Sequence, residues 1–350
     1  MSDAPDLSPQ EAVDRWLDRA SLDRAAQTIA GYRGQLRHFV RWANSEGIDS
    51  VAQLDPWDIE TFETHRRGND LAAITLRNEL GTLRQLLDYC ARIGVVDDEL
   101  PESIELPKVS ADDQTDETIL EPHRAKSLLD VYRNGDEDYP RGHAFLELAW
   151  YTGARMGGLR GLDLGDVDFQ EGFVRFRHRP ETGTPLKNAY DGERVVGISQ
   201  PVVDALTDYV AEDRPDVTDD HGRQPLFATM HGRISLNVLR TSCYYATIPC
   251  RFRSCPHGKD RDSCDWTTQA DASKCPSSRS PHQIRSGSIT WQLDRGLRAD
   301  VVAERVNASV EIIEQHYDQA SDLAAYERRR EKHLSKLGFQ TEDDNEEETA

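Results

Sequence analysis

The first hundred residues place apolar side chains at the three- and four-residue spacing of amphipathic helices. The segment SPQEAVDRWLDRA opens with Ser8 and carries Glu11 three residues later, which is the capping-box arrangement of a helix start. Helical spacing recurs in three later segments, RAAQTIAGYRGQLRHFVRWANSEGI, DPWDIETFETHRR and ITLRNELGTLRQLLDYCARIGV. Two of them finish beside a glycine, Gly47 and Gly94, as helices often do. The pattern predicts a helical domain over residues 1–107.

A polar and acidic stretch separates this domain from the rest of the chain. Residues 108–118 read KVSADDQTDET, directly after a proline, and predict a linker. Helical spacing then returns, but GFVRFRHR alternates like a strand and ERVVGIS is a second strand candidate, with the turn-rich PETGTPLKNAYDG between them. Residues 119–338 therefore predict a second domain that is mainly α-helical with a small antiparallel β-sheet. The final TEDDNEEETA predicts a disordered acidic tail over residues 339–350.

The charge of the chain bears on which partners it can have. The net charge is −21, from 63 acidic and 42 basic residues, and only 7 of the basic residues are lysines. Acidic, lysine-poor chains resemble the proteins of halophilic archaea, which stay soluble in concentrated salt through self-repulsion. An acidic chain ordinarily disfavours a nucleic-acid partner. At high salt, however, counterion release contributes little to DNA binding, so this charge does not exclude DNA.

Neither a membrane span nor a secretion signal is found in the sequence. No segment approaches the ~20 apolar residues that cross a bilayer. The N-terminal MSDAPDLSPQ has no basic segment followed by an apolar one, as a secretion signal requires. The expectation is a cytoplasmic protein with no membrane partner.

Cysteines are concentrated in one short part of the second domain. Five of the six lie between Cys243 and Cys275, and without a secretion signal such clustering favours metal ligation over disulfides. A polar insert over residues 250–275 has too little apolar material to build its own core. We expect it to hold a structural zinc ion, and the alternative is a loop with free thiols. The expected ligands are Cys250, Cys255, Cys264 and Cys275, with His257 as an alternative ligand.

Five side chains suited to phosphate chemistry are spread over four motifs of the second domain. Taken singly, each has an ordinary structural reading, such as a surface arginine, a solvated turn lysine or a packing tyrosine. They are Arg155 in TGAR, Lys187 in the turn TPLKN, His282 and Arg285 in HQIR, and Tyr317 in EQHYDQ. The order T-G-x-R, turn lysine, H-x-x-R and late tyrosine resembles the tyrosine recombinase (phage integrase, Xer-like) family, and this combination is specific.

The resemblance implies a fold and a reaction. The fold would be a helical, SAM-like core-binding domain followed by a mixed α/β catalytic domain, and the activity would be site-specific cleavage and rejoining of double-stranded DNA by a homo-tetramer. Arg155 and Arg285 would neutralise the scissile phosphate. Tyr317 would attack it to form a 3′-phosphotyrosyl intermediate, Lys187 would protonate the leaving 5′-oxygen, and His282 would orient a phosphate oxygen or transfer a proton. No cofactor is needed for this chemistry.

Three positions depart from the family pattern. Gly158 stands where an acidic residue is common, and Ser286 stands where a histidine usually follows the second arginine. The family's LGH, nine residues before the tyrosine, is VNA here, so Ala308 replaces the usual histidine. These departures keep open a catalytically weakened DNA-binding protein of the same fold. A zinc-stabilised regulatory protein, in which the cysteine insert is the active feature, and a type IB topoisomerase, which uses similar residues, also stay open.

Overall fold

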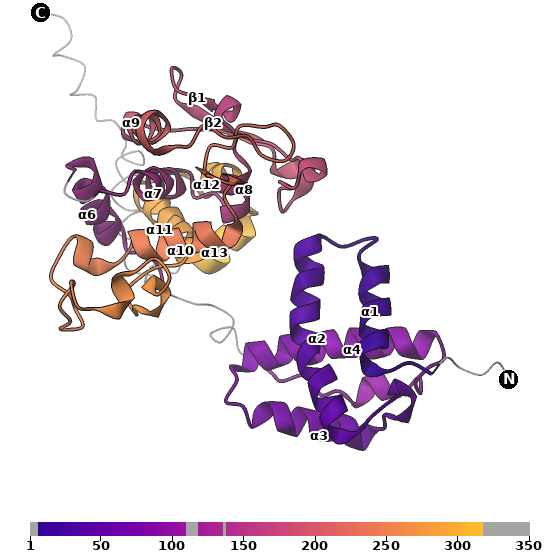
Figure 1. Ribbon diagram of the computed structural model, residues 1–350. Coiled ribbons are helices and arrows are strands. Elements are labelled where there is room, and N and C mark those ends of the chain that lie inside the picture. The colour runs from indigo at the N-terminus through magenta and orange to yellow at the C-terminus, as the bar shows by residue number, and fades with distance from the viewer. Residues whose placement is uncertain (1–5, 110–117, 136–137, 318–350) are drawn as a thin grey trace, which may run out of the picture. The chain divides into compact units, whose positions relative to one another are not determined.

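The computed structural model describes residues 6–109, 118–135 and 138–317 (Figure 1). The acidic tail expected over residues 339–350 and most of the expected linker lie outside the described residues. The chain divides into two compact units, Met1–Asp116 and Glu117–Ala350. Each unit has its own apolar core. In the described part of the chain, no helix is long and apolar enough to cross a membrane.

The N-terminal unit consists of helices that bury their apolar faces against one another. Its main helices are α1 (Pro9–Ala20), α2 (Ala26–Glu46), α3 (Pro56–Arg67) and α4 (Ala73–Arg92). A short 3₁₀ turn, Val51–Gln53, lies between α2 and α3, and another, Leu100–Ser103, follows α4. The capping box predicted at Ser8 and Glu11 is confirmed at the start of α1. In the core, the rings of Phe39 and Phe62 meet edge to face with their centroids 5.6 Å apart. The first domain is therefore helical, as its sequence predicts.

The second unit surrounds helix α7 (Pro140–Thr152), which is buried along most of its length. Helices α6 (Pro122–Arg133), α9 (Gln200–Asp208), α10 (Leu236–Ala246) and α11 (Pro281–Asp294) all contact α7. Short helix α8 (Met156–Gly161) follows it, and α12 (Ala299–Val306) and α13 (Val310–Tyr317) pack against α11 near the end of the described chain (Figure 1). The unit is mainly helical, as predicted.

The β-structure of this unit is small and antiparallel, as the alternating segments predict. Strands β1 (Val167–Asp168), β2 (Phe173–Phe176) and β3 (Arg194–Gly197) form one sheet in the order β1-β2-β3. The turn-rich segment that contains the expected lysine connects β2 to β3. A second pair consists of β4 (Ala228–Thr229) and β5 (Gly232–Arg233). The cysteine insert follows α10 and contains only short 3₁₀ turns, at Pro249–Arg251, Asp265–Thr267 and Ala272–Lys274.

Candidate active site

The first site residue, Arg155, follows a tight turn at the end of α7. Thr152 is fully buried, and its hydroxyl accepts a hydrogen bond from the backbone N–H of Ala154 at 3.2 Å. Gly153 has a φ of 58°, in the left-handed region that glycine enters at little cost. A Cβ at Gly153 would lie 2.8 Å from Cγ1 of Val306, closer than two carbon atoms pack. The turn therefore requires glycine, and it places Arg155 at the N-cap of α8.

The second arginine, Arg285, reaches the same place from α11. Only 5% of Arg285 is exposed, and its Nη1 donates to the carbonyls of Gly153 at 2.5 Å and Val306 at 2.7 Å. Nη1 of Arg155 donates to the carbonyl of Asn307 at 2.5 Å. The two arginines lie 130 residues apart in the sequence, yet they bind adjacent carbonyl groups. The structure therefore brings the two predicted phosphate-binding guanidiniums together.

A third arginine, Arg194 at the start of β3, joins them, and sequence reasoning missed it. Its Nε donates to the carbonyl of Arg305 at 2.7 Å, and its guanidinium lies 4.1 Å from the centroid of the Phe176 ring. Burial, together with the positive charges of Arg285 and Arg155, lowers the pKa of Arg194 to about 9. The sequence offers one local signal, its place at the start of the strand after the lysine turn, but nothing in that segment points to Arg155 or Arg285.

The C-terminal end of α12 holds all three guanidiniums. The last carbonyls of a helix have no partner within it and carry the negative end of the helix dipole. Here the successive carbonyls of residues 305, 306 and 307 accept hydrogen bonds from the three arginines. Asn307 ends the helix with a φ of 54°, a left-handed conformation that asparagine tolerates better than most residues. The helix end thus fixes the positions of three guanidinium groups.

The turn that carries Lys187 also contacts this helix end. Lys187 itself is exposed. The side-chain amide of its neighbour Asn188 donates to Oδ1 of Asn307 at 2.6 Å. Nδ2 of Asn307 in turn donates to the carbonyl of Asp191 at 2.9 Å. The turn is therefore hydrogen-bonded to the residue that binds Arg155.

The remaining predicted residues lie on α11 and α13. His282 is exposed on the first turn of α11, three residues before Arg285 and so on a neighbouring part of the helix surface. Tyr317 is the last residue of α13, and its side chain lies outside the described part of the chain. Helix α13 is anchored by Ile313, which is fully buried in a small apolar cluster with residues of α11 and α12. The helix bearing the tyrosine is thus packed against the helices that position the arginines.

The structure shows what occupies the positions that depart from the family pattern. A Cβ at Gly158 would lie 3.3 Å from Cδ1 of Phe176, so the Phe176 ring, on which the Arg194 guanidinium is stacked, fills the space next to Gly158. Ser286 is buried. Ala308 packs against the apolar cluster between α11 and α12 and brings no polar side-chain group to the site. None of the three positions supplies an acid or a base.

The cysteine insert has donor groups that suit zinc, but the structure does not gather them. All six cysteines are unpaired thiols. Burial raises the pKa of the Cys250 thiol, Arg261 opposes that rise, and the neighbouring Cys255 and Cys275 add to it. Nε2 of His257 lies 3.1 Å from Oγ of Ser277. Among the described residues, no three His, Cys, Asp or Glu side chains are grouped so as to hold a metal ion.

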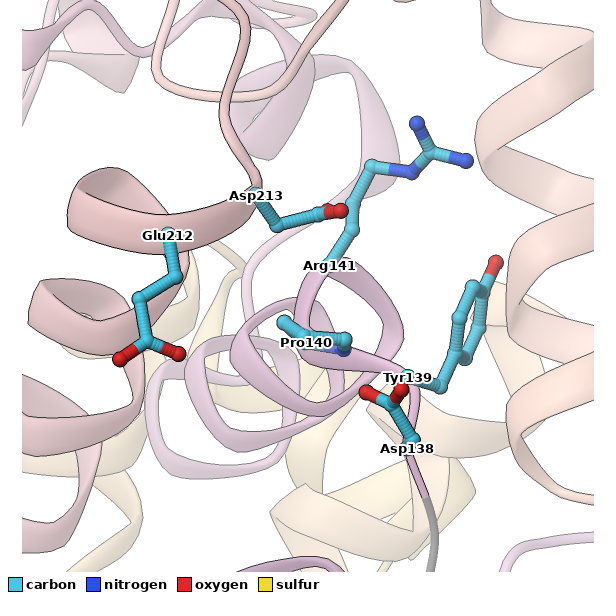
Figure 2. A pocket seen from close by; sticks show the side chains of 6 residues that line it. All are labelled: Asp138, Tyr139, Pro140, Arg141, Glu212 and Asp213. Carbon is cyan, nitrogen blue, oxygen red and sulfur yellow. The ribbon is translucent and has the colours of Figure 1, made fainter.

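A cavity of about 450 Å³ lies at the N-terminal end of α7, and Figure 2 shows the side chains that line it. The site arginines lie toward the other end of this helix, after Gly153. The cavity is lined by Asp138, Tyr139, Pro140, Arg141, Glu212 and Asp213. A helix rises ~1.5 Å per residue, so the length of α7 separates this cavity from Gly153 by roughly 20 Å. With three carboxylates against one guanidinium, its lining does not suit a phosphate. The cavity is therefore not part of the candidate active site.

Comparison with known proteins places both units in one family. Residues 13–94 match the "Phage integrase, N-terminal SAM-like domain" and residues 118–323 match the "Phage integrase family". Tyrosine recombinase XerD of Mycobacterium tuberculosis is 26% identical over 307 residues, which cover 83% of this chain and 86% of that protein.

Two solved structures are also similar to this chain. A Tn1549 transposon integrase bound to a circular intermediate DNA has a TM-score of 0.66 at 16% identity, with 93% of this chain and 99% of that chain covered. The N-terminal domain of a phage integrase/site-specific recombinase from Haloarcula marismortui is 44% identical and covers 29% of this chain and 99% of that one, with a TM-score of 0.29.

Proposed function

The chain belongs to the phage integrase family and is a tyrosine-type site-specific recombinase, and we propose that it acts on duplex DNA through a 3′-phosphotyrosyl intermediate. The observation that carries this proposal is the convergence of three guanidiniums on the end of α12. Cleaving a phosphodiester without a metal requires fixed positive charge around the non-bridging oxygens. Guanidiniums supply it because they stay charged and bind phosphate oxygens in pairs.

Each predicted residue takes one role in the proposed reaction. The phenolic oxygen of Tyr317 loses its proton to His282 or to water and forms a bond to phosphorus, and the bond between phosphorus and the 5′-oxygen breaks. Arg155 and Arg285 stabilise the negative charge that develops on the phosphate, which is usually the largest catalytic contribution. Lys187 gives its proton to the leaving 5′-oxygen, and His282 orients the phosphate or transfers a proton. Rejoining reverses these steps and needs no external energy source, because the phosphotyrosine conserves the bond.

Further features of the protein belong to the same proposal. Its partner is double-stranded DNA, on which it assembles as a homo-tetramer, and the DNA-bound Tn1549 integrase supports the DNA partner. The core-binding domain spans residues 1–107, the linker 108–118 and the catalytic domain 119–338. The division of the chain between Asp116 and Glu117 supports these bounds. The protein would be cytoplasmic and of haloarchaeal type, and the acidic, lysine-poor composition supports the second of these assignments.

We also assign a structural zinc ion to the insert over residues 250–275. The clustering of Cys250, Cys255, Cys264 and Cys275 in one short insert supports it, and Cys255 and Cys275 lie close enough to Cys250 to raise the pKa of its thiol. Metal binding would draw the thiolates together, since such ligand sets often form only with the ion. The proposed cleavage reaction does not involve this metal.

A covalent-adduct assay tests the proposed function. The binding site is first selected from random-sequence duplexes at high KCl with the Tyr317→Phe variant, and a nicked duplex is then built from that site. The nick lets the cleaved fragment diffuse away and traps the phosphotyrosine. Wild type should form the adduct, and Tyr317→Phe should bind but form none. Tyr32→Phe is the matched control, since Tyr32 packs on Trp16 in the N-terminal unit, and it should react normally.

The outcomes separate the candidate activities. Selective binding without an adduct from wild type would favour the catalytically weakened DNA-binding protein. Relaxation of supercoiled plasmids that lack the selected site would favour a type IB topoisomerase.

A further inference from the structure

Asn307 contacts both Arg155 and the turn that carries Lys187. Its backbone carbonyl accepts a hydrogen bond from Arg155 at 2.5 Å, and its Oδ1 lies 3.3 Å from the same Arg155 nitrogen. The side chain of Asn307 also contacts the turn after Lys187. Its Oδ1 accepts a hydrogen bond from the side-chain amide of Asn188 at 2.6 Å, and its Nδ2 donates to the carbonyl of Asp191 at 2.9 Å. One short side chain therefore links the phosphate-binding arginine to the turn that carries the lysine.

The backbone at this position does not by itself require asparagine. With a φ of 54° and a ψ of 68°, the residue closes α12 in the left-handed region, where glycine would fit with less strain. The family pattern has glycine here, in its LGH. Asparagine adds one amide oxygen and one amide nitrogen to that conformation, and both are hydrogen-bonded to the lysine turn. The side chain is thus used for contacts that glycine could not make.

The tip of the lysine turn is exposed, and its other contacts come from its own hairpin, where the Leu186 N–H donates to Nδ1 of His178 at 3.0 Å and the rings of His178 and Tyr190 have centroids 4.9 Å apart. Lys187, Asn188, Ala189 and Tyr190 are all exposed. Ala189 has a φ of 49°, a conformation in which alanine is strained by roughly 1–2 kcal/mol. The two hydrogen bonds of Asn307 bracket this strained residue, one on each side. They therefore hold the turn on both sides of Ala189, where the backbone is strained.

We propose that Asn307 is a positioning residue that fixes the Lys187 turn relative to Arg155 and so determines where the lysine delivers its proton. This inference rests on the proposed recombinase reaction. It also assigns a function to the VNA segment, in which Ala308 provides no polar side-chain group. Asparagine here acts through the lysine and does not itself react with DNA.

The test uses a leaving group that needs no proton. When sulfur replaces the bridging 5′-oxygen of the scissile phosphate, tyrosine attack expels a thiolate. The corresponding thiol has a pKa of about 8.5, far below that of an alcohol, so the thiolate leaves without being protonated. A variant that fails only in delivering the proton is therefore slow on the oxygen substrate and restored on the sulfur substrate. Adduct formation is measured in single turnover on nicked duplexes of both kinds.

Asn307→Gly is the main variant, because glycine keeps the left-handed backbone. We expect it to slow cleavage of the oxygen substrate about ten- to a hundred-fold, the usual scale for a misplaced catalytic group. On the sulfur substrate it should approach the wild-type rate, as should Lys187→Ala. Arg285→Ala should stay slow on both. Asn134→Gly is the matched control, since Asn134 is exposed at the end of α6, and it should behave as wild type.

A second variant tests whether the contact with the turn matters. Asn188→Ala should also slow the oxygen substrate selectively, and the double variant Asn188→Ala/Asn307→Gly should be little slower than Asn307→Gly alone.

The outcomes distinguish this role from the proposed function. If wild type and Lys187→Ala behave as expected but Asn307→Gly slows both substrates equally, or neither, the positioning role is wrong while the recombinase reaction stands. If wild type forms no adduct on either substrate, the proposed function fails and the role of Asn307 fails with it. Far-UV circular dichroism and DNA binding of each variant show that the fold is kept.

Discussion

Replacing Gly153 by alanine tests how the turn after α7 builds the site. Two costs can be read from the structure. Alanine at a φ of 58° is disfavoured by about 1–2 kcal/mol. Its Cβ would lie 2.8 Å from Cγ1 of Val306, an overlap of the kind that costs about 1–3 kcal/mol in a packed core. Together they predict a loss of about 2–5 kcal/mol, a large part of the ~5–15 kcal/mol that stabilises a domain.

Urea unfolding followed by tryptophan fluorescence measures this loss, since the buried Trp150 lies on α7 beside the turn. Gly157→Ala is the matched control. No atom lies within 4 Å of a Cβ at Gly157, which is in α8, so alanine there should be neutral or slightly stabilising. Adding Val306→Ala to Gly153→Ala should remove the overlap and give a favourable coupling of about 1–3 kcal/mol. The φ cost and the close approaches of the Cβ to Oγ of Ser288 at 3.1 Å and Nε2 of Gln292 at 3.3 Å should remain.

The same change should also affect cleavage. The carbonyl of Gly153 accepts a hydrogen bond from Arg285, so a shift of the turn displaces that guanidinium. A displacement near 1 Å can cost about a hundred-fold in rate, so adduct formation by Gly153→Ala should fall on that scale. The reasoning is refuted if Gly153→Ala and Gly157→Ala have the same stability within about 0.5 kcal/mol.

Three further changes have expected outcomes. Partial burial would raise the pKa of Asp219, but hydrogen bonds, first from Arg233, outweigh burial and lower the pKa to about 2. The ionised carboxylate should therefore stabilise the fold above pH ~4, and this contribution should be lost as the pH falls toward 2. Acid titrations of Asp219→Asn should show a smaller loss of stability over that range. Gly287→Ala would put a Cβ 2.1 Å from the Leu120 carbonyl oxygen, so its urea midpoint should fall well below that of wild type. Elemental analysis should find about one zinc per chain, lost when the cysteines of the 250–275 insert become serines; a metal-free wild type would contradict this.

Local patterns in the sequence were sufficient to predict most of the fold. Apolar spacing and the Ser8–Glu11 capping box identify helices because both depend on residues within one or two turns. The two strands and the turn between them were likewise predicted from alternation and turn residues. The strand predicted from GFVRFRHR ends at Phe176 in the structure. Beyond it, Arg179 forms an ion pair with Asp166, which lies 13 residues earlier in the chain, and alternation does not encode this contact.

The candidate site was only partly predictable. Arg155 and Arg285 were found because they belong to compact motifs. Arg194 and Asn307 were missed because their importance lies in contacts across more than a hundred residues of sequence. Each looks ordinary in its own segment, one at the start of a strand and the other at the end of a helix. Only folding brings Arg194 to the end of α12, and only folding brings Asn307 to the lysine turn.

Gathering three guanidiniums in one place has a physical cost, and the structure indicates how that cost is offset. The pKa of Arg194 is lowered to about 9 by burial and by the positive charges of Arg285 and Arg155, so keeping all three charged opposes folding. The residue nevertheless stays cationic near neutral pH. The carbonyls at the negative end of α12 offset part of the repulsion, and a phosphate would offset more. The site therefore has uncompensated positive charge before DNA binds, and this charge is already positioned for the negative charge that develops on the phosphate oxygens during cleavage.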